Sequence, residues 1–160
     1  MTPPSADRVV TVRGPLQGQS RLCARILADL PEYFGLEDSN AAYARSADTL
    51  PSFVGAVDGR DVGLLLLAQT SDVAVELHLI AVLREFHRVG LGGALVRAAQ
   101  AHLCTQGVHW FHVKTLAPRD PDPGYAKTRA FYAAMGFEPL EEIVQVWGSD
   151  NPCLLLVKRL

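Results

Sequence analysis

The sequence has no long hydrophobic run, no run of basic residues and no closely spaced cysteine pair. Its longest apolar stretch, Gly63 to Ala68, is far shorter than the roughly 20 residues that a membrane-spanning helix needs. The opening segment MTPPSADRVV also lacks the apolar core of a secretory signal peptide. These absences predict a cytoplasmic protein with no membrane partner.

Charge and cysteine usage exclude two further classes of protein. The formal net charge is −2, and no basic stretch is present that would attract nucleic acid. Cys23, Cys104 and Cys153 are odd in number and form no C-x-x-C pair, so they indicate neither a disulfide framework nor a thiolate metal site. We therefore expect reduced thiols, no nucleic-acid partner and a small-molecule or peptide ligand.

What is present is the composition of one globular domain: 160 residues, of which 49% are hydrophobic and 20% charged. Apolar periodicity predicts helices near residues 20–30, 38–47, 91–105 and 126–135, with Asp38 or Ser39 capping the second. Strands are expected at 9–13, on both sides of the Asp58-Gly59 turn, at 73–82, at 108–116 and on both sides of 147–152. This order predicts a mixed α/β domain with helices on a central sheet.

Three glycines, Gly90, Gly92 and Gly93, stand at the start of the helix predicted for 91–105. A glycine costs a helix interior about 1 kcal/mol relative to alanine, so this cluster suggests that the backbone approaches an anion closely. The dinucleotide fingerprint would need glycine at Leu95, and the Walker loop would need Gly-Lys-Ser/Thr, so neither motif is present. A tight turn that binds no ligand is the alternative interpretation.

The stretch VELHLIAVLREFHRVGLGGALV, residues 75–96, resembles the coenzyme A-binding core of the GNAT acetyltransferase superfamily. His87 stands where that family has Gln or Arg, Gly90 and Gly92 occupy its two small-residue places, and Gly93 begins the helix. The resemblance implies that acetyl-CoA binds here, with its pyrophosphate held mostly by main-chain N–H groups and the side chain of His87 secondary. The implied coenzyme A contacts are Ile80, Ala81, Val82, His87, Arg88, Val89, Gly90, Leu91, Gly92 and Gly93.

The stretch TRAFYAAMGFEPL, residues 128–140, is similar to a later helix and strand of the same family, which extends the resemblance to about 73–140. One departure is that Tyr125 stands where the family often has an asparagine. The resemblance implies a GNAT-like α/β domain with a mixed, mostly antiparallel sheet of about six or seven strands and about four helices. A single N-acetyltransferase domain over 1–160 would then comprise an acceptor side (1–72), a coenzyme A core (73–140) and C-terminal strands (141–160).

Two polar residues share one face of the strand predicted for 73–82. Period-two alternation places Val73, Val75, Leu77 and Leu79 on one side and Ala74, Glu76, His78 and Ile80 on the other. Burial of Glu76 and His78 is costly unless they are hydrogen-bonded or face a cleft. Glu76 matches the strand glutamate that is the general base in some members of the family, and burial is expected to raise its pKa.

Each of these residues also has a structural alternative. Glu76 could instead pair with Arg97 or Arg129, and His78 is either a second candidate base or a histidine of the core. The resemblance implies that the main chain at Ile80 and Val82 binds pantetheine and polarises the thioester. It also places Tyr132 where the family has the tyrosine that protonates the departing thiolate. Tyr132 as a core tyrosine is the alternative.

Other chemistries fit less well. His102, Cys104, His109 and His112 are close in sequence, but their spacing points the side chains in different directions, so we expect no metal site. A Gly-x-Ser-x-Gly elbow is absent, which disfavours a hydrolase.

The sequence therefore predicts an enzyme that transfers an acetyl group from acetyl-CoA directly to a primary amine. The alternatives are a non-catalytic acyl-CoA-binding or sensing module and a partner-binding domain without coenzyme A affinity. Glu32, Tyr33, Phe34 and Glu37 could line a cleft for a cationic acceptor, or they could form a solvated loop. The acceptor and the oligomeric state, a homodimer included, stay open.

Overall fold

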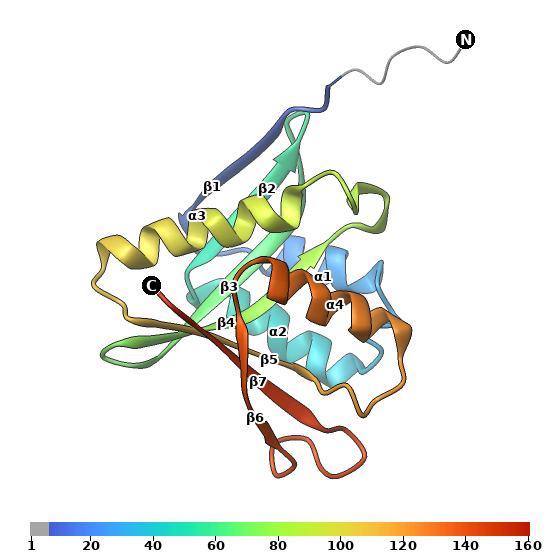
Figure 1. Ribbon diagram of the computed structural model, residues 1–160. Helices are drawn as coiled ribbons and strands as arrows, with labels where there is room; N and C mark the ends of the chain where they lie inside the picture. Colours follow the sequence, from blue (N-terminus) through green and yellow to red (C-terminus); the bar gives the residue numbers. More distant parts are fainter. Residues whose placement is uncertain (1–6) are drawn as a thin grey trace. The chain divides into compact units, whose positions relative to one another are not determined.

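The computed structural model describes residues 7–160 (Figure 1). Its strands are hydrogen-bonded in the order β1-β2-β3-β4-β5-β7-β6. The elements are β1 (Val10–Leu16), α1 (Ser20–Ala28), α2 (Glu37–Thr49), β2 (Ser52–Val57), β3 (Arg60–Ser71), β4 (Ala74–Val82), the 3₁₀ turn η1 (Arg84–Phe86), α3 (Leu91–Thr105), β5 (Trp110–Leu116), α4 (Pro123–Ala134), β6 (Glu138–Ile143) and β7 (Cys153–Arg159).

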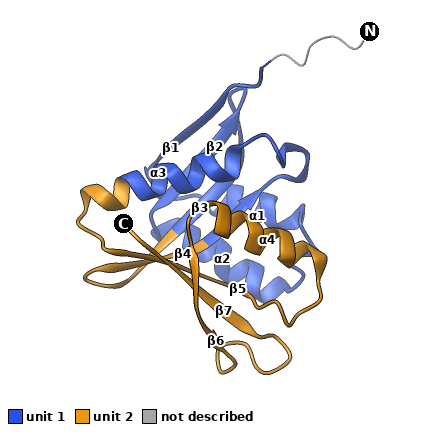
Figure 2. Ribbon diagram, viewed as in Figure 1, with its two compact units in different colours: residues 1–66, 79–101 blue, residues 67–78, 102–160 orange. Residues whose placement is uncertain are grey.

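This architecture confirms the predicted fold class, a mixed α/β fold with a mostly antiparallel sheet. β4 and β5 pair in parallel, whereas β1 with β2, β2 with β3, β5 with β7 and β6 with β7 are antiparallel. The chain divides into two compact units: unit 1 contains the residues up to 66 together with 79–101, and unit 2 contains 67–78 and 102–160 (Figure 2). β3, β4 and α3 contribute residues to both units.

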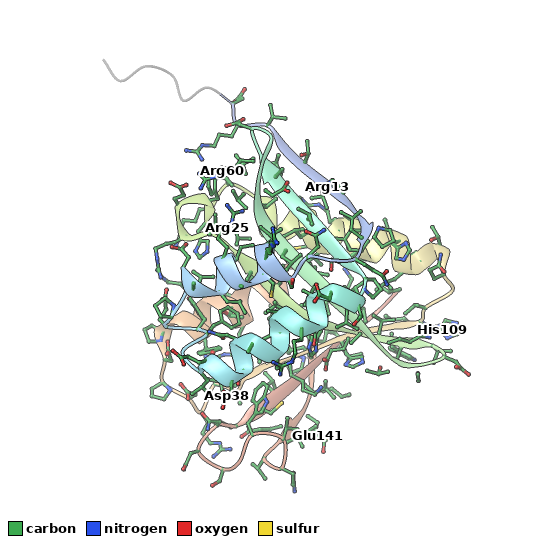
Figure 3. The ribbon with its side chains drawn as sticks, turned by 180° about the vertical axis from the view of Figure 1, so that it is seen from behind. Arg13, Arg25, Asp38, Arg60, His109 and Glu141 are labelled. Carbon is green, nitrogen blue, oxygen red and sulfur yellow. The ribbon has the colours of Figure 1, made fainter. Side chains whose placement is uncertain are left out.

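In unit 1, helices cover both faces of β1, β2 and the first part of β3, with α1 and α2 on one side and α3 on the other (Figures 1 and 3). Gly55 and Gly63 are paired in the β2–β3 ladder. A Cβ atom built on Gly55 would lie 2.6 Å from Cδ1 of Leu91, and one on Gly63 would lie 2.9 Å from Cδ2 of Leu91. The two glycines therefore let the start of α3 lie directly on the sheet.

Arginines connect α1 and β1 to β3 in the same unit. Arg13 donates to both carboxylate oxygens of Asp61 at 2.7 and 2.8 Å, and Arg25 donates to the backbone carbonyl of Asp61 at 2.5 Å (Figure 3). Hydrogen bonding by Arg13 lowers the pKa of Asp61 despite the opposing effect of burial. The apolar face of α1 is buried through Leu22, Cys23, Ile26 and Leu27.

In unit 2, β5 lies between the start of β4 and β7, and β6 forms the edge beside β7 (Figure 1). Phe111, Val113 and Thr115 are buried on one face of β5, and α4 packs against this strand. The ring of Phe137 lies 5.3 Å from that of Phe111. The other face of β5, which carries His112 and Lys114, is only half-buried.

Most local predictions are confirmed. α3 has the predicted bounds, and Asp58 (φ 51°) and Gly59 (φ 81°) form the hairpin turn with both residues in the left-handed region. The predicted cap of α2 is wrong, because Leu36 occupies the N-cap and makes no side-chain cap bond, while Asp38 lies in the first helical turn. There its negative charge interacts favourably with the positive end of the helix dipole.

The start predicted for α4 is also wrong, since the helix begins at Pro123 rather than near residue 126. The carboxylate of Asp122 accepts from the backbone N–H of Gly124 at 2.7 Å, and proline is well suited to the first helical position.

We predict that Gly55→Ala destabilises the protein by about 1–3 kcal/mol, because the new methyl group overlaps the side chain of Leu91. Thermal and urea unfolding would measure the loss. As the control, adding Leu91→Ala should make the cost of Gly55→Ala smaller than it is in the wild-type background. An unchanged cost in both backgrounds would show that the close approach of α3 is not what requires glycine.

Candidate active site

The face of β4 that carries Glu76 and His78 is half-buried, while the opposite face is buried. Burial alternates along the whole strand, with Val75, Leu77 and Leu79 buried and Glu76 and His78 intermediate. The predicted alternation is therefore confirmed, and both polar residues lie on the same side of the strand.

Glu76 has a hydrogen-bond donor on each carboxylate oxygen. Nδ1 of His78 lies 3.1 Å from Oε1, and Nζ of Lys114 on β5 donates to Oε2. The side chain of Glu76 is 12% exposed, against 31% for His78 and 33% for Lys114. The carboxylate is thus the most buried member of a three-residue cluster, which we call the Glu76 cluster.

The expected rise in the pKa of Glu76 is wrong. Burial acts to raise this pKa, but hydrogen bonds from His78 and Lys114, together with the charge of Lys114, lower it to about 2. A carboxylate that receives two such bonds is stabilised in its charged form. Glu76 is therefore ionised at neutral pH.

Sequence reasoning missed Lys114 and named arginines instead as the alternative partners of Glu76. Arg129 donates to the backbone carbonyl of Leu116 at 2.8 Å, and Arg97 is exposed on α3. The sequence signal that could have identified Lys114 is the period-two alternation of β5. This alternation places Lys114 on the same face as Trp110 and His112, opposite the buried face.

A second histidine lies beside the cluster. His112 is the register partner of Glu76 in the parallel β4–β5 ladder, and its Nε2 lies 2.8 Å from the hydroxyl of Thr70. That hydroxyl also donates to the carbonyl of Ala74 at 3.2 Å, so Nε2 of His112 is the donor toward Thr70. Burial lowers the pKa of His112 below its ordinary value.

Tyr132 lies on α4 and is 5% exposed. Its ring is 5.4 Å from that of Phe131 and 5.7 Å from that of Phe137. Phe137 follows Gly136, which ends α4 with a φ of 91° as the sequence predicts. This aromatic packing fixes the ring of Tyr132 in unit 2.

The glycine-rich loop lies in unit 1 and contains a 3₁₀ turn that the sequence did not predict. Arg88 (φ 65°) and Gly90 (φ 85°) both adopt the left-handed region, and the amide of Ala94 donates to the carbonyl of Gly90 at 3.1 Å, which starts α3. The N–H groups at the beginning of a helix have no partner within it, so those of Leu91, Gly92 and Gly93 are available to an anion.

The loop is held by side chains as well as by its own backbone. Nε2 of His87 donates to the carbonyl of Val82 at 2.7 Å, so this ring secures the loop rather than pointing to a ligand. The backbone N–H of Arg84 donates to Asp29 at 2.7 Å, and its guanidinium pairs with Glu32 at 2.5 Å. Arg84, the first residue of η1, thereby ties the α1–α2 connection to the loop.

The residues expected to line an acceptor cleft lie in that connection and at the first residue of α2. Glu32 is exposed, and its pKa is lowered by hydrogen bonding to Arg84, while Glu37 is exposed in the first turn of α2. The ring of Phe34 contacts that of Tyr43 edge-on at 6.1 Å. The carboxylate of Glu32 is thus already paired with the guanidinium of Arg84, which competes with a cationic amine for the same oxygens.

Over residues 7–160, no group of three or more histidine, cysteine or acidic side chains is arranged to hold a metal ion. Cys104 is exposed, and His109 lies in the connection before β5 (Figure 3). In the same part of the chain, every helix is too short or too polar to cross a bilayer.

Comparison with known proteins identifies a family. The family model of the acetyltransferase (GNAT) domain matches residues 49–139, more than half of the chain. Among curated proteins, none matches the sequence significantly.

Solved structures share the fold at low sequence identity. The ribosomal-protein-S18-alanine N-acetyltransferase from Escherichia coli is 17% identical with a TM-score of 0.75, and the match covers 94% of each chain. An aminoglycoside 6'-N-acetyltransferase complexed with coenzyme A is 16% identical with a TM-score of 0.70, covering 94% of this chain and 96% of that one. A GNAT family acetyltransferase from Elizabethkingia anophelis with acetyl-CoA bound is 15% identical with a TM-score of 0.68, covering 94% and 98%.

The pKa of Glu76 makes a prediction about stability. Because the folded-state pKa of about 2 lies below the ordinary 4.5, Glu76 stabilises the fold above pH 4.5, and this contribution disappears as the pH falls toward 2. The difference in unfolding free energy between wild type and Glu76→Gln should therefore be larger at pH 7 than near pH 3, as measured by urea unfolding. Glu141→Gln, which removes an exposed carboxylate on β6, is the control for charge. An equal Glu76→Gln difference at both pH values would show that Glu76 is not held ionised.

Proposed function

Since the chain belongs to the GNAT acetyltransferase family, which makes it an acetyl-CoA-dependent acyltransferase, we propose a specific reaction. In this reaction, the acetyl group passes directly from acetyl-CoA to a primary amine. The observation that carries the proposal is the contact between Glu76 and His78 on one face of β4. A carboxylate and an imidazole in contact provide a proton acceptor, which amine acetylation requires. Both residues lie inside the segment matched by the family model.

Acetyl-CoA would be bound by the loop and the end of β4. The N–H groups of Leu91, Gly92 and Gly93 would receive the pyrophosphate at the positive end of α3. The left-handed backbone at Arg88 and Gly90 sets the direction in which the chain enters the helix. Ile80, Ala81 and Val82 would contribute main-chain groups to pantetheine and to the thioester carbonyl, with Val89 completing the loop.

The reaction requires proton transfers at the nitrogen and at the sulfur in addition to the attack. A protonated amine first loses a proton to the Glu76–His78 pair, and the neutral nitrogen then attacks the thioester carbonyl carbon. The carbon–sulfur bond breaks as the intermediate collapses, and the second proton of the nitrogen restores the hydroxyl of Tyr132 after that residue has acted. Tyr132 would give a proton to the departing thiolate, so that the products are an amide and free coenzyme A.

The acceptor is proposed as a small-molecule or peptide amine. Two proteins of the same fold are named for such groups, an alanine of ribosomal protein S18 and the 6' position of an aminoglycoside. A screen for thiol release from acetyl-CoA across small amines, polyamines, aminoglycosides and peptide N-termini would identify the class. Binding of acetyl-CoA without thiol release for any amine would instead favour a sensing module.

We expect Gly92→Glu to abolish acetyl-CoA binding, because it adds bulk and negative charge where the pyrophosphate would lie. Calorimetry with acetyl-CoA measures the affinity, and thermal melting confirms folding. Ala101→Glu adds the same side chain at an exposed position of α3 and should bind like wild type. A folded Gly92→Glu protein that binds normally would remove the loop from the binding site.

Replacing Tyr132 by Phe keeps the ring and its packing but deletes the hydroxyl. If this hydroxyl protonates the thiolate, kcat should fall by about 10²-fold or more while acetyl-CoA affinity changes little. Steady-state kinetics with an acceptor from the screen and calorimetry with acetyl-CoA provide the two measurements. Wild-type turnover with chemistry rate-limiting would make Tyr132 a core tyrosine only.

A further inference from the structure

The contacts of Glu76 decide which member of the Glu76–His78 pair accepts the proton. Oε1 of Glu76 accepts a hydrogen bond from Nδ1 of His78, and Oε2 accepts one from the ammonium of Lys114. Both oxygens are therefore engaged by donors, one of which carries a full positive charge. A carboxylate in this state is a poor proton acceptor, because protonation would leave the partly buried charge of Lys114 uncompensated.

The same contacts fix the histidine. An ionised carboxylate can only accept hydrogen bonds, so the nitrogen that faces it, Nδ1 of His78, must carry a proton. In the neutral ring, the basic nitrogen is then Nε2. A histidine whose Nδ1–H is held by a carboxylate is thereby set in one tautomer and one ring orientation.

We propose that Lys114 is a positioning residue for acyl transfer, which holds Glu76 ionised and in place so that Nε2 of His78 takes the proton from the substrate amine. The inference rests on the proposed function and assigns the base that the sequence leaves open. Lys114 and Glu76 act through His78 and do not themselves exchange protons with the substrate.

The proton balance is complete with groups already described. The ammonium form of the acceptor gives one proton to Nε2 of His78, which later releases it to solvent. The nitrogen forms its bond to the carbonyl carbon, the carbon–sulfur bond breaks, and the second nitrogen proton ends on the coenzyme A thiolate. Each turnover therefore releases one proton.

Other titratable groups face the Glu76 cluster, and one of them is a competing base. His112 approaches from β5, and Cys153 from β7, where burial raises the pKa of the thiol. His112 uses Nε2 to donate to Thr70 and lies across from Glu76 in the ladder. His112→Gln therefore belongs in the test beside His78→Gln.

The first experiment reads the tautomer without any substrate. In the full chain labelled with ¹⁵N-histidine, the His78 signals are assigned by their loss in His78→Gln. In its neutral form, wild-type His78 should carry its proton on Nδ1 and not on Nε2, Lys114→Arg should keep this tautomer, and Lys114→Met should lose it. A wild-type His78 with its proton on Nε2, or a Lys114→Met protein with an unchanged tautomer, would overturn the proposal.

The second experiment reads catalysis. With an acceptor from the screen, Lys114→Met should lower kcat by about 10- to 100-fold and alter the acidic limb of the pH profile, and Lys114→Arg should restore most of the rate. Lys127→Met removes an exposed lysine of α4 and should behave like wild type. The proposal fails if Lys114→Met has the same kcat and pH profile as Lys127→Met. It also fails if His112→Gln, and not His78→Gln, removes the acidic limb of the pH profile.

The two experiments separate the proposals. A wild-type protein that binds acetyl-CoA but releases no thiol with any amine would refute the proposed function. The tautomer measurement would then still decide whether Lys114 and Glu76 set the histidine. Because the wild-type tautomer requires no variant at Lys114, the arrangement stays testable even if Lys114→Met does not fold.

Discussion

The half-buried carboxylate of Glu76 is the constraint on which the candidate site depends. A charge in such a position is stable only when donors replace the water that it loses, and His78 and Lys114 supply them. Their geometry comes from the sheet: His78 follows Glu76 by two residues on one strand, while Lys114 reaches the carboxylate from β5. The ladder that joins Glu76 to His112 thus also sets the ionisation of the site.

A steric constraint has the same role in unit 1. Leu91 is almost fully buried, and it fits only because Gly55 and Gly63 leave space above the sheet. Since Leu91 is the first residue of α3, this contact fixes where the helix begins and hence where its free N–H groups point. The glycines of the sheet and the glycines of the loop therefore act together, although only the latter resemble a binding motif.

Local patterns predicted much of this molecule. The bounds of α3, the alternation of β4 and the Asp58-Gly59 turn follow from periodicity and turn chemistry, which depend on residues close in sequence. The partner of Glu76 could not be obtained in this way, because Lys114 is 38 residues away and is brought near only by strand pairing. The pKa direction was wrong for the same reason, since burial was foreseen and the compensating donors were not. Assignment of the family was possible because each of the two motifs that carry the resemblance, 75–96 and 128–140, lies in one continuous segment.

The most direct test of the account is an NMR titration of the side-chain carboxyl carbon of Glu76 in the folded protein. If Lys114 and His78 hold the carboxylate ionised, the signal should titrate with a midpoint near 2. A midpoint at or above the ordinary value of 4.5 would contradict it, because burial would then outweigh the two donors and Glu76 itself would be the stronger candidate for the base.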